Sequence, residues 1–273
     1  MRRRRAAAAG GARRRRRLPH RRALVLPGPR DRGAPAGRDG GRVSGPPFEV
    51  SHIIFDIDGT LTDYRAALFA GLEEVASHLA EAGDGIEISL DDLGVIRNGV
   101  AADPAWHDRT LQEIRRESFR RVIEAFGNPP GVTVDEIAEV YYRTRDATMV
   151  VFPEVEATLG RLRERGFTLT TASNGTFPLA RVGLDRYFSA MQYSRDVGVR
   201  KPDPGFFRLA AERGGHDPSR TLAVGDRYDN DYEPALAAGL HAVLVDRFDR
   251  SEGLDVVSVG RLDELLPLVS LAR

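Results

Sequence analysis

The sequence predicts an α/β protein, a doubly wound parallel sheet of Rossmann-like type with an inserted α-helical domain. Two observations carry this prediction. Short apolar runs alternate with amphipathic helical segments from residue 151 onward, and one further run of this kind, "HIIF", lies at residues 52–55. Between them, residues 64–150 show almost no strand pattern. Strands that alternate with helices indicate a parallel sheet, so we interpret the helical block as an insertion into its first crossover.

The first half of the folded chain begins with the strand "HIIF", a continuous apolar run typical of a buried parallel strand. Four helices are then expected at about residues 64–82, 89–98, 105–126 and 134–150. The segments "AGDG", "NGVAADP" and "GNPPG" separate them and have the composition of turns. An apolar stripe marks the third helix: Ile114, Phe119, Val122, Ile123 and Phe126.

In the second half, strands are expected at "FTLTTA", "MQYS", "TLAV" and "HAVLV". Helices are expected at "EVEATLGRLRERG", near 177–183, at "PGFFRLAAERG", at "DYEPALAAG" and near 261–268. The predicted organisation is therefore a tail over 1–49, a core formed by 50–63 and 151–273, and a helical domain over 64–150.

Composition divides the 273-residue chain into two unlike parts. Residues 1–50 contain 15 arginines and three acidic residues, which gives this segment a net charge of +12. The remainder has 25 basic and 37 acidic residues and a net charge of −12, so the two parts cancel to zero. Cysteine is absent, which excludes disulfides, a thiolate nucleophile and cysteine-bound zinc. No apolar run approaches the length of a membrane span. We expect a soluble, cytoplasmic protein with no membrane partner.

The tail over residues 1–49 is rich in Arg, Gly, Pro and Ala and lacks periodicity, so we expect it to be disordered and dispensable. Three alternatives to a dispensable tail remain open: a segment that binds nucleic acid, an organelle transit peptide, or upstream sequence included by a wrongly assigned start codon. Binding of nucleic acid is not favoured, and the sequence predicts no oligomeric state.

Polar residues follow the predicted strands at the edge where ligands bind in open parallel sheets. Asp56 and Asp58 are two positions apart and can face the same side. Asp226 and Asp231 approach from another strand end, and so many carboxylates together require positive charge. Oxygen ligands of this kind suit Mg²⁺. Lys201, which is the only lysine beside 39 arginines, supplies further positive charge.

Four segments, "FDIDGTLTD", "TASNG", "VGVRKPDP" and "VGDRYDNDYEPALAAG", resemble the four signature segments of the haloacid dehalogenase (HAD) superfamily, in the usual order. The resemblance covers about residues 52–246. The helical insertion resembles the family's helical cap, which is placed between the first and second segments. By this resemblance the expected activity is that of a HAD-like phosphoric monoester hydrolase.

The resemblance also implies roles for individual residues. Asp56 would be the nucleophile that forms an aspartyl-phosphate, Asp58 the general acid and base, and Lys201 the residue that balances charge in the transition state. The other implied roles are substrate binding by Thr60, Ser173 and Asn174, Mg²⁺ binding by Asp56, Asp58 (through its backbone carbonyl) and Asp226, and support of the metal waters or Lys201 by Asp231.

The acid at position 58 favours phosphoryl chemistry, because the dehalogenases of the superfamily lack an acid there. The phosphonate-cleaving branch uses a cap lysine, and no lysine lies between residues 64 and 150. We therefore expect an Mg²⁺-dependent phosphatase for a small phosphorylated metabolite of the nucleotide or sugar-phosphate class. A phosphomutase of the same superfamily and a non-catalytic binding protein on this fold remain as alternatives.

The insertion offers five candidates for contact with substrate, although packing of the tryptophan and solvation of the arginines is the favoured interpretation of each taken singly. The candidates are Arg97, Trp106, His107, Arg115 and Arg116.

Overall fold

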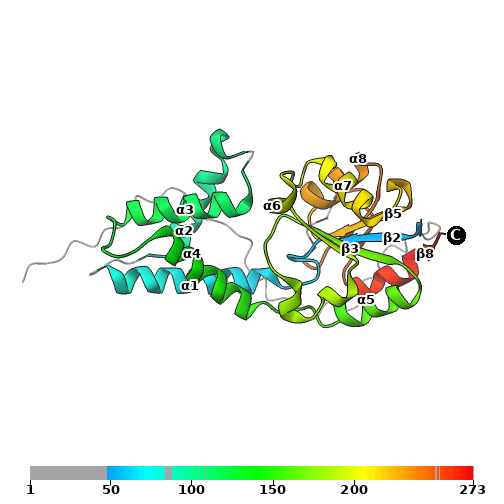
Figure 1. Cartoon of the computed structure of the whole chain (residues 1–273), viewed down its shortest axis with the longest axis horizontal. Coiled ribbons are helices and arrows are strands. Elements are labelled where there is room, and N and C mark those ends of the chain that lie inside the picture. Colours follow the sequence, from blue (N-terminus) through cyan, green and yellow to red (C-terminus); the bar gives the residue numbers. More distant parts are fainter. Residues whose placement is uncertain (1–47, 84–87, 108, 250, 252, 273) are drawn as a thin grey trace, which may run out of the picture.

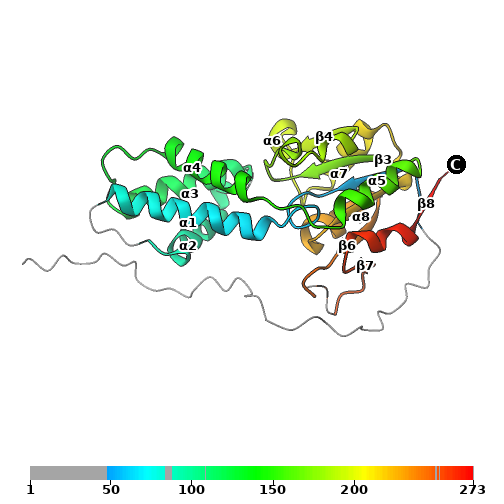
Figure 2. The ribbon, with the colours of Figure 1, turned by 90° about the horizontal axis from the view of Figure 1, so that it is seen from below.

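The computed structural model describes residues 48–83, 88–107, 109–249, 251 and 253–272. Two parts lie side by side along the long axis of the molecule, an α/β core and a helical cap, and a second view from below shows the same arrangement (Figure 1, Figure 2). The predicted tail lies outside the described residues except for its last two positions, Phe48 and Glu49. None of the described helices has the length and apolar character needed to cross a bilayer.

The core is built on a six-stranded sheet in which every neighbouring pair is parallel. This confirms the predicted fold class. The strands in spatial order are β4 (Ala190–Tyr193), β3 (Thr168–Ser173), β2 (His52–Phe55), β5 (Thr221–Gly225), β6 (His241–Val245) and β7 (Ser258–Val259).

Both faces of the sheet are covered by helices, which explains why β2 is apolar throughout. Ile53 and Phe55 pack in the cluster that contains α5 (Val155–Glu164), whereas Ile54 packs in the cluster of α7 (Pro204–Gly214) and α8 (Glu233–Ala237). Figure 1 shows α7 and α8 above the sheet and α5 below it. Function is therefore expected at the strand ends, where the sheet is left uncovered.

The cap consists of α1 (Tyr64–Ala82), α2 (Leu90–Ala101), α3 (Leu111–Ala125) and α4 (Val134–Thr148). It has its own apolar core, to which all four helices contribute. Helices α1 and α4 approach closely at Gly71, where an added Cβ would meet the Tyr141 ring at 3.0 Å. The apolar stripe expected on the third helix is confirmed, since its five residues are all buried: Ile114, Phe119, Val122, Ile123 and Phe126.

The third cap helix begins later than predicted, at Leu111 instead of residue 105. Thr110 and Glu113 form a capping box there, in which the Thr110 hydroxyl accepts from the Glu113 N–H at 3.2 Å and the Glu113 carboxylate accepts from the Thr110 N–H at 2.8 Å. Such a reciprocal pair marks a helix start. The preceding Pro104–Trp106 forms only a short 3₁₀ turn.

Several short elements also differ from the prediction. Strand β1 (Phe48–Val50) pairs in parallel with β8 (Val269–Leu271), so Phe48 and Glu49 belong to the folded core and not to the tail. The helices expected near 177–183 and 261–268 are 3₁₀ segments, and that expected at 231–239 is divided into a π turn and α8. Strand β7 and the one-turn helix α6 (Ser194–Val197) were not predicted. Pro267 lies inside the last 3₁₀ segment and lacks the N–H that a regular α-helix uses there.

Candidate active site

The register of the sheet places the predicted acidic residues at one edge. Phe55, the last residue of β2, pairs with Thr171 of β3 and with Val224 of β5. The Asp56 N–H then donates to the Val224 carbonyl at 2.9 Å, which fixes Asp56 beside the end of β5. Asp56 is buried although it carries an ionisable group. The sheet itself therefore positions the candidate nucleophile.

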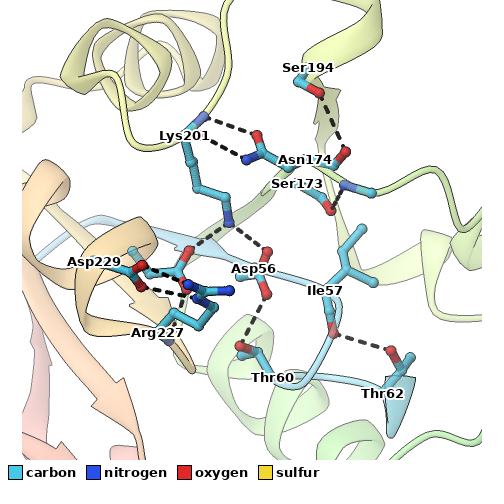
Figure 3. A network of polar contacts seen from close by, with 12 residues as sticks. Asp56, Ile57, Thr60, Thr62, Ser173, Asn174, Ser194, Lys201, Arg227 and Asp229 are labelled. Carbon is cyan, nitrogen blue, oxygen red and sulfur yellow. Dashed lines mark hydrogen bonds and ion pairs between the residues drawn. The ribbon is translucent and has the colours of Figure 1, made fainter. Parts of the chain in front are cut away.

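Lys201 lies at the centre of this edge and joins two carboxylates. Its Nζ donates to Asp56 Oδ1 and to Asp231 Oδ1, both at 2.6 Å, and the side chain is 3% exposed (Figure 3). The other Asp231 oxygen accepts from the Arg227 N–H at 3.0 Å. A buried cation is stable only with such partners, so these contacts hold the lysine in one position.

The side chain of Asn174 holds the loop that carries Lys201. Its Nδ2 donates to the Lys201 carbonyl at 2.8 Å, and its Oδ1 accepts from the Lys201 N–H at 2.9 Å (Figure 3). Both polar ends of the amide are thus engaged with the backbone. The side chain thereby fixes the Lys201 backbone, and substrate binding by Asn174 stays a prediction.

Asp58 projects toward the loop after β3. A Cβ on Gly175 would lie 2.2 Å from Asp58 Oδ2, and the Gly175 N–H donates to the Ser173 hydroxyl at 2.9 Å. Asp58 Oδ1 is buried, and no described residue hydrogen-bonds to it. Burial raises the pKa of Asp58, and this effect is opposed first by Arg145 and then by Arg115. The residue is thus a carboxyl group that retains a proton more readily than usual.

The loop after β2 packs closely against the loop after β5. Gly59 has a φ of +94°, and an added Cβ would lie 2.5 Å from Asp226 Oδ2, so this position requires glycine. The Thr60 hydroxyl donates to Asp56 Oδ2 at 3.4 Å. Thr60 therefore lies against the candidate nucleophile, as its predicted place in the site requires.

A buried ion pair also holds the loop after β2. Arg247 pairs with Glu154 at 2.6 Å and donates to the Thr60 carbonyl at 3.0 Å. The guanidinium also lies over the Phe152 ring, 3.8 Å from its centroid. This network was not foreseen, because nothing in the sequence distinguishes Arg247 from the chain's other arginines.

Three carboxylates converge closely enough to hold a metal ion. Oxygen atoms of Asp56, Asp226 and Asp231 all lie within 4.8 Å of one another. Carboxylate oxygens in this arrangement suit a hard cation such as Mg²⁺. The Asp58 side chain is not a member of this group, and metal binding by its backbone carbonyl stays a prediction.

The charges of this group favour the binding of a cation. Burial raises the pKa of Asp56 well above its ordinary value, the carboxylates of Asp231, Asp226 and Asp58 raise it further, and only Lys201 opposes them. Burial lowers the pKa of Lys201, but its two aspartate partners raise it above the ordinary value. One buried ammonium therefore does not balance the cluster, and a divalent cation would keep Asp56 ionised.

Two cap arginines lie near this edge of the sheet, Arg115, which was a predicted candidate, and Arg145, which was not. Arg145 is 2% exposed and donates to Asp146 Oδ1 at 2.7 Å and to Thr176 Oγ1 at 3.1 Å. Its position at the end of α4 was an available signal, but it is hard to recognise among 39 arginines. Arg115 donates to the Tyr64 hydroxyl at 3.0 Å.

The other cap candidates contribute less to this region. Arg116 pairs with the exposed Asp135 at 2.5 Å. His107 is exposed, but its carbonyl accepts from Arg200, the neighbour of Lys201, and this contact joins the cap to the core. Trp106 is partly buried in the turn before α3, and Arg97 is exposed and donates to Asn98 Oδ1 at 3.0 Å.

The sequence and the fold of this chain are similar to those of several known proteins. Residues 50–239 match the family model described as haloacid dehalogenase-like hydrolase. A phosphoserine phosphatase of Thermus thermophilus is 36% identical over 159 residues, which cover 56% of this chain and 61% of that enzyme. A phosphoglycolate phosphatase of Escherichia coli is 30% identical over 82% of this chain and 94% of its own length. The crystal structure of a 2-haloacid dehalogenase from Pseudomonas syringae superposes with a TM-score of 0.67 at 27% identity, covering 80% of this chain and 97% of that one.

Proposed function

The chain belongs to the haloacid dehalogenase-like hydrolases, and from this membership we propose that it is an Mg²⁺-dependent phosphatase that acts through an aspartyl-phosphate on Asp56. The family resemblance and the hydrolase activity predicted from the sequence are confirmed. Relatives named as phosphoserine and phosphoglycolate phosphatases support a small phosphate ester as substrate. The observation that carries the proposal is Lys201 held between Asp56 and Asp231, beside Asp226.

In the first step, the Asp56 carboxylate attacks phosphorus and the bond from phosphorus to the ester oxygen breaks. Asp58 donates its proton to the departing oxygen, so the leaving group departs as an alcohol. Burial and the raised pKa of Asp58 favour the protonated form that this step needs. Lys201 donates hydrogen bonds to the oxygens on which negative charge accumulates, and Ser173 offers a hydroxyl on the Asp58 side of the site.

In the second step, Asp58 acts as a base. It accepts a proton from a water molecule whose oxygen attacks phosphorus, and the bond between phosphorus and the Asp56 oxygen breaks. Inorganic phosphate leaves, Asp56 is again a carboxylate, and Asp58 is again protonated. The two residues thus end the cycle in the states in which they began.

Asp56, Asp226 and the backbone carbonyl of Asp58 would hold Mg²⁺ in this site. The ion when bound supplies positive charge that offsets the carboxylates and the phosphoryl oxygens. Both oxygens of Asp231 are engaged, one by Lys201 and one by the Arg227 N–H. Asp231 is therefore proposed as the residue that positions Lys201.

The acid at position 58 supports a phosphatase over a dehalogenase. An alkoxide leaving group needs a proton, whereas a halide does not. Asp58 lies in the site with one buried oxygen that no described residue engages, so this oxygen of the carboxyl group is not committed to a partner within the described protein. The dehalogenase that superposes on this chain therefore supports the fold, and Asp58 supports the different reaction.

A phosphate-release screen over small phosphomonoesters tests the proposal. We expect release that requires Mg²⁺, stops on exhaustive chelation and returns when Mg²⁺ is added back. Accumulation of inorganic phosphate, instead of an isomeric phosphate ester, distinguishes the phosphatase from a phosphomutase. Activity undiminished by chelation would remove the metal from the proposal, and no release from any ester would overturn it.

A further inference from the structure

Two arginines and two tyrosines form a compact group in the cap. The Arg115 guanidinium lies 4.7 Å from the ring centroid of Tyr141, and that of Arg145 lies 4.8 Å from the ring centroid of Tyr142. Arg115 also donates to the Tyr142 hydroxyl at 3.4 Å. The stacked aromatic rings restrict both guanidiniums, which reduces the entropy cost of binding a ligand with them.

Arg115 differs from the other arginines of α3 in its partners. Arg116 pairs with Asp135, and both Arg120 and Arg121 pair with Glu117. Within the described part of the chain, Arg115 forms no ion pair, and its hydrogen bonds and ring contacts are all with tyrosines. A half-buried cation that contacts phenol groups lacks a directly paired carboxylate, and an anionic ligand would supply one.

The group lies next to the candidate general acid. Arg145 donates to Thr176, the neighbour of Gly175, which packs directly against Asp58. Arg115 donates to the Tyr64 hydroxyl, and the Tyr64 N–H in turn bonds to the carbonyl of Thr62 in the loop after β2. Thr62 is bridged to Asp58 within that loop. An anion at Arg115 would therefore belong to the part of the substrate that leaves toward Asp58.

We propose that Arg115 binds a carboxylate on the leaving group, so that the substrate is the phosphate ester of a small hydroxy acid. The inference rests on the proposed phosphatase function. Lys201 and the metal ligands already serve the phosphoryl group, so the arginine on the Asp58 side is left for a second anion on the same molecule. A guanidinium can hold a carboxylate through two parallel hydrogen bonds, which distinguishes an acid from an alcohol of the same size.

Two esters of nearly equal size test the inference, glycolic acid 2-phosphate and 2-hydroxyethyl phosphate, which differ in having a carboxylate or an alcohol. We expect the wild-type protein to prefer the acid. In Arg115→Gln, kcat/KM for the acid relative to the alcohol should fall roughly 10- to 100-fold, mainly through KM, as expected for one charge-assisted hydrogen bond. Arg115→Lys should recover part of the preference. Arg116→Gln is the matched control and should leave the ratio as in the wild type, because Arg116 pairs with the exposed Asp135.

The outcomes separate the inference from the function on which it rests. Equal hydrolysis of both esters, or an Arg115→Gln variant that keeps the wild-type ratio, would overturn the carboxylate subsite while the phosphatase stands. Hydrolysis of neither ester, nor of any other phosphomonoester, would overturn both. A melting curve of each variant confirms that the compared proteins are folded.

Discussion

Lys201 is the residue on which the geometry of the site depends most. It is 3% exposed and bonds to Asp56 and Asp231 at 2.6 Å each, while Asn174 holds its backbone. An ammonium on a flexible chain fits between two carboxylates, whereas a planar guanidinium does not replace it in the same space. We infer that this difference is the reason for a single lysine in a chain with 39 arginines.

We predict that Lys201→Arg lowers kcat roughly a hundredfold or more, because the charge is kept but its position is lost. Steady-state phosphate release measures the effect, and a melting curve shows whether the variant is folded. Arg195→Lys, an exposed exchange on the preceding turn, is the control and should be nearly silent. Near-normal kinetics in a folded Lys201→Arg protein would mean that the lone lysine is an accident of composition.

His52 gives the molecule a pH dependence that is independent of the active site. It is 0% exposed, lies between the hydroxyls of Thr170 at 2.8 Å and Thr221 at 3.3 Å, and stacks on His216 at 4.7 Å. Burial, followed by the charge of His216, lowers the pKa of His52 to about 3. Between that value and the ordinary pKa near 6.5, the unfolded chain binds a proton that the folded chain does not.

The free energy of unfolding should therefore fall as the pH falls below about 6.5, by up to about 1.4 kcal/mol per pH unit from this residue. Protonation of paired carboxylates also contributes at low pH, so the comparison needs a variant. His52→Gln lacks the titrating group, and its midpoint of denaturation should fall less between pH 7 and pH 5 than that of the wild type. Parallel pH profiles for the two proteins would contradict the assignment.

At the scale of elements, the loops after the strands determine the site through close packing. Gly175 approaches Asp58 so closely that a Cβ would lie 2.2 Å from its Oδ2, whereas a Cβ on Gly99 in α2 would meet no atom within 4 Å. Substitution by alanine should therefore disturb the structure at Gly175 and be tolerated at Gly99.

Gly175→Ala should displace Asp58 and reduce turnover by about a hundredfold, the loss expected when a reacting group shifts by about 1 Å. Gly99→Ala should leave turnover unchanged and stabilise the protein by up to about 1 kcal/mol, because alanine favours the helix. Phosphate release and melting midpoints measure both effects. Full activity in Gly175→Ala would show that Asp58 tolerates movement and is not held by this contact.

The elements that the sequence predicted well are those with a local signal. The α7 segment matches residue for residue, since Asp203, Pro204 and Gly215 mark its ends and an apolar face fixes its interior. The pairing of β1 with β8 could not be predicted, because its three-residue strands lie more than 200 positions apart and neither carries a periodic pattern. Thr110 and Glu113 did carry the signal of a helix start, which the sequence analysis overlooked.

Some residues of the site could be predicted from the sequence, whereas several of its contacts could not. Asp56, Asp226 and Lys201 follow strands or lie in signature segments, so their convergence was predictable. The engagement of the Asn174 side chain with the Lys201 backbone depends on how two loops meet in space. The contact of Arg145 with Thr176 joins the cap to the core, and its place at the end of α4 is too weak a signal to predict that contact among 39 arginines.

For the molecule as a whole, the described fold begins at Phe48, where β1 joins the C-terminal strand β8. We predict that deletion of residues 1–47 leaves turnover and the melting midpoint unchanged. Deletion of residues 1–50 is the matched control and should lower the midpoint, because it also removes β1. A salt-sensitive shift of DNA or RNA by the full chain, lost on deletion of 1–47, would instead support a nucleic-acid-binding tail.

The cap and the core are joined by several polar contacts, and two of these lie next to residues of the proposed mechanism. Arg145 of α4 reaches Thr176, beside the loop that holds Asp58, and Arg200 reaches the His107 carbonyl from the position before Lys201. In the proposed mechanism the cap contacts the leaving group and the core contacts the phosphoryl group. The phosphoryl group is transferred to Asp56 before water attacks it.

A burst measurement with p-nitrophenyl phosphate and Mg²⁺ tests that claim directly, because this leaving group needs no proton from Asp58 at neutral pH. In Asp58→Asn the first step should proceed while the second lacks its base. We predict a rapid release of about one nitrophenolate per chain, followed by slow turnover, and no release from Asp56→Asn. A full burst or wild-type turnover from folded Asp56→Asn, with deamidation excluded by mass, would contradict the account.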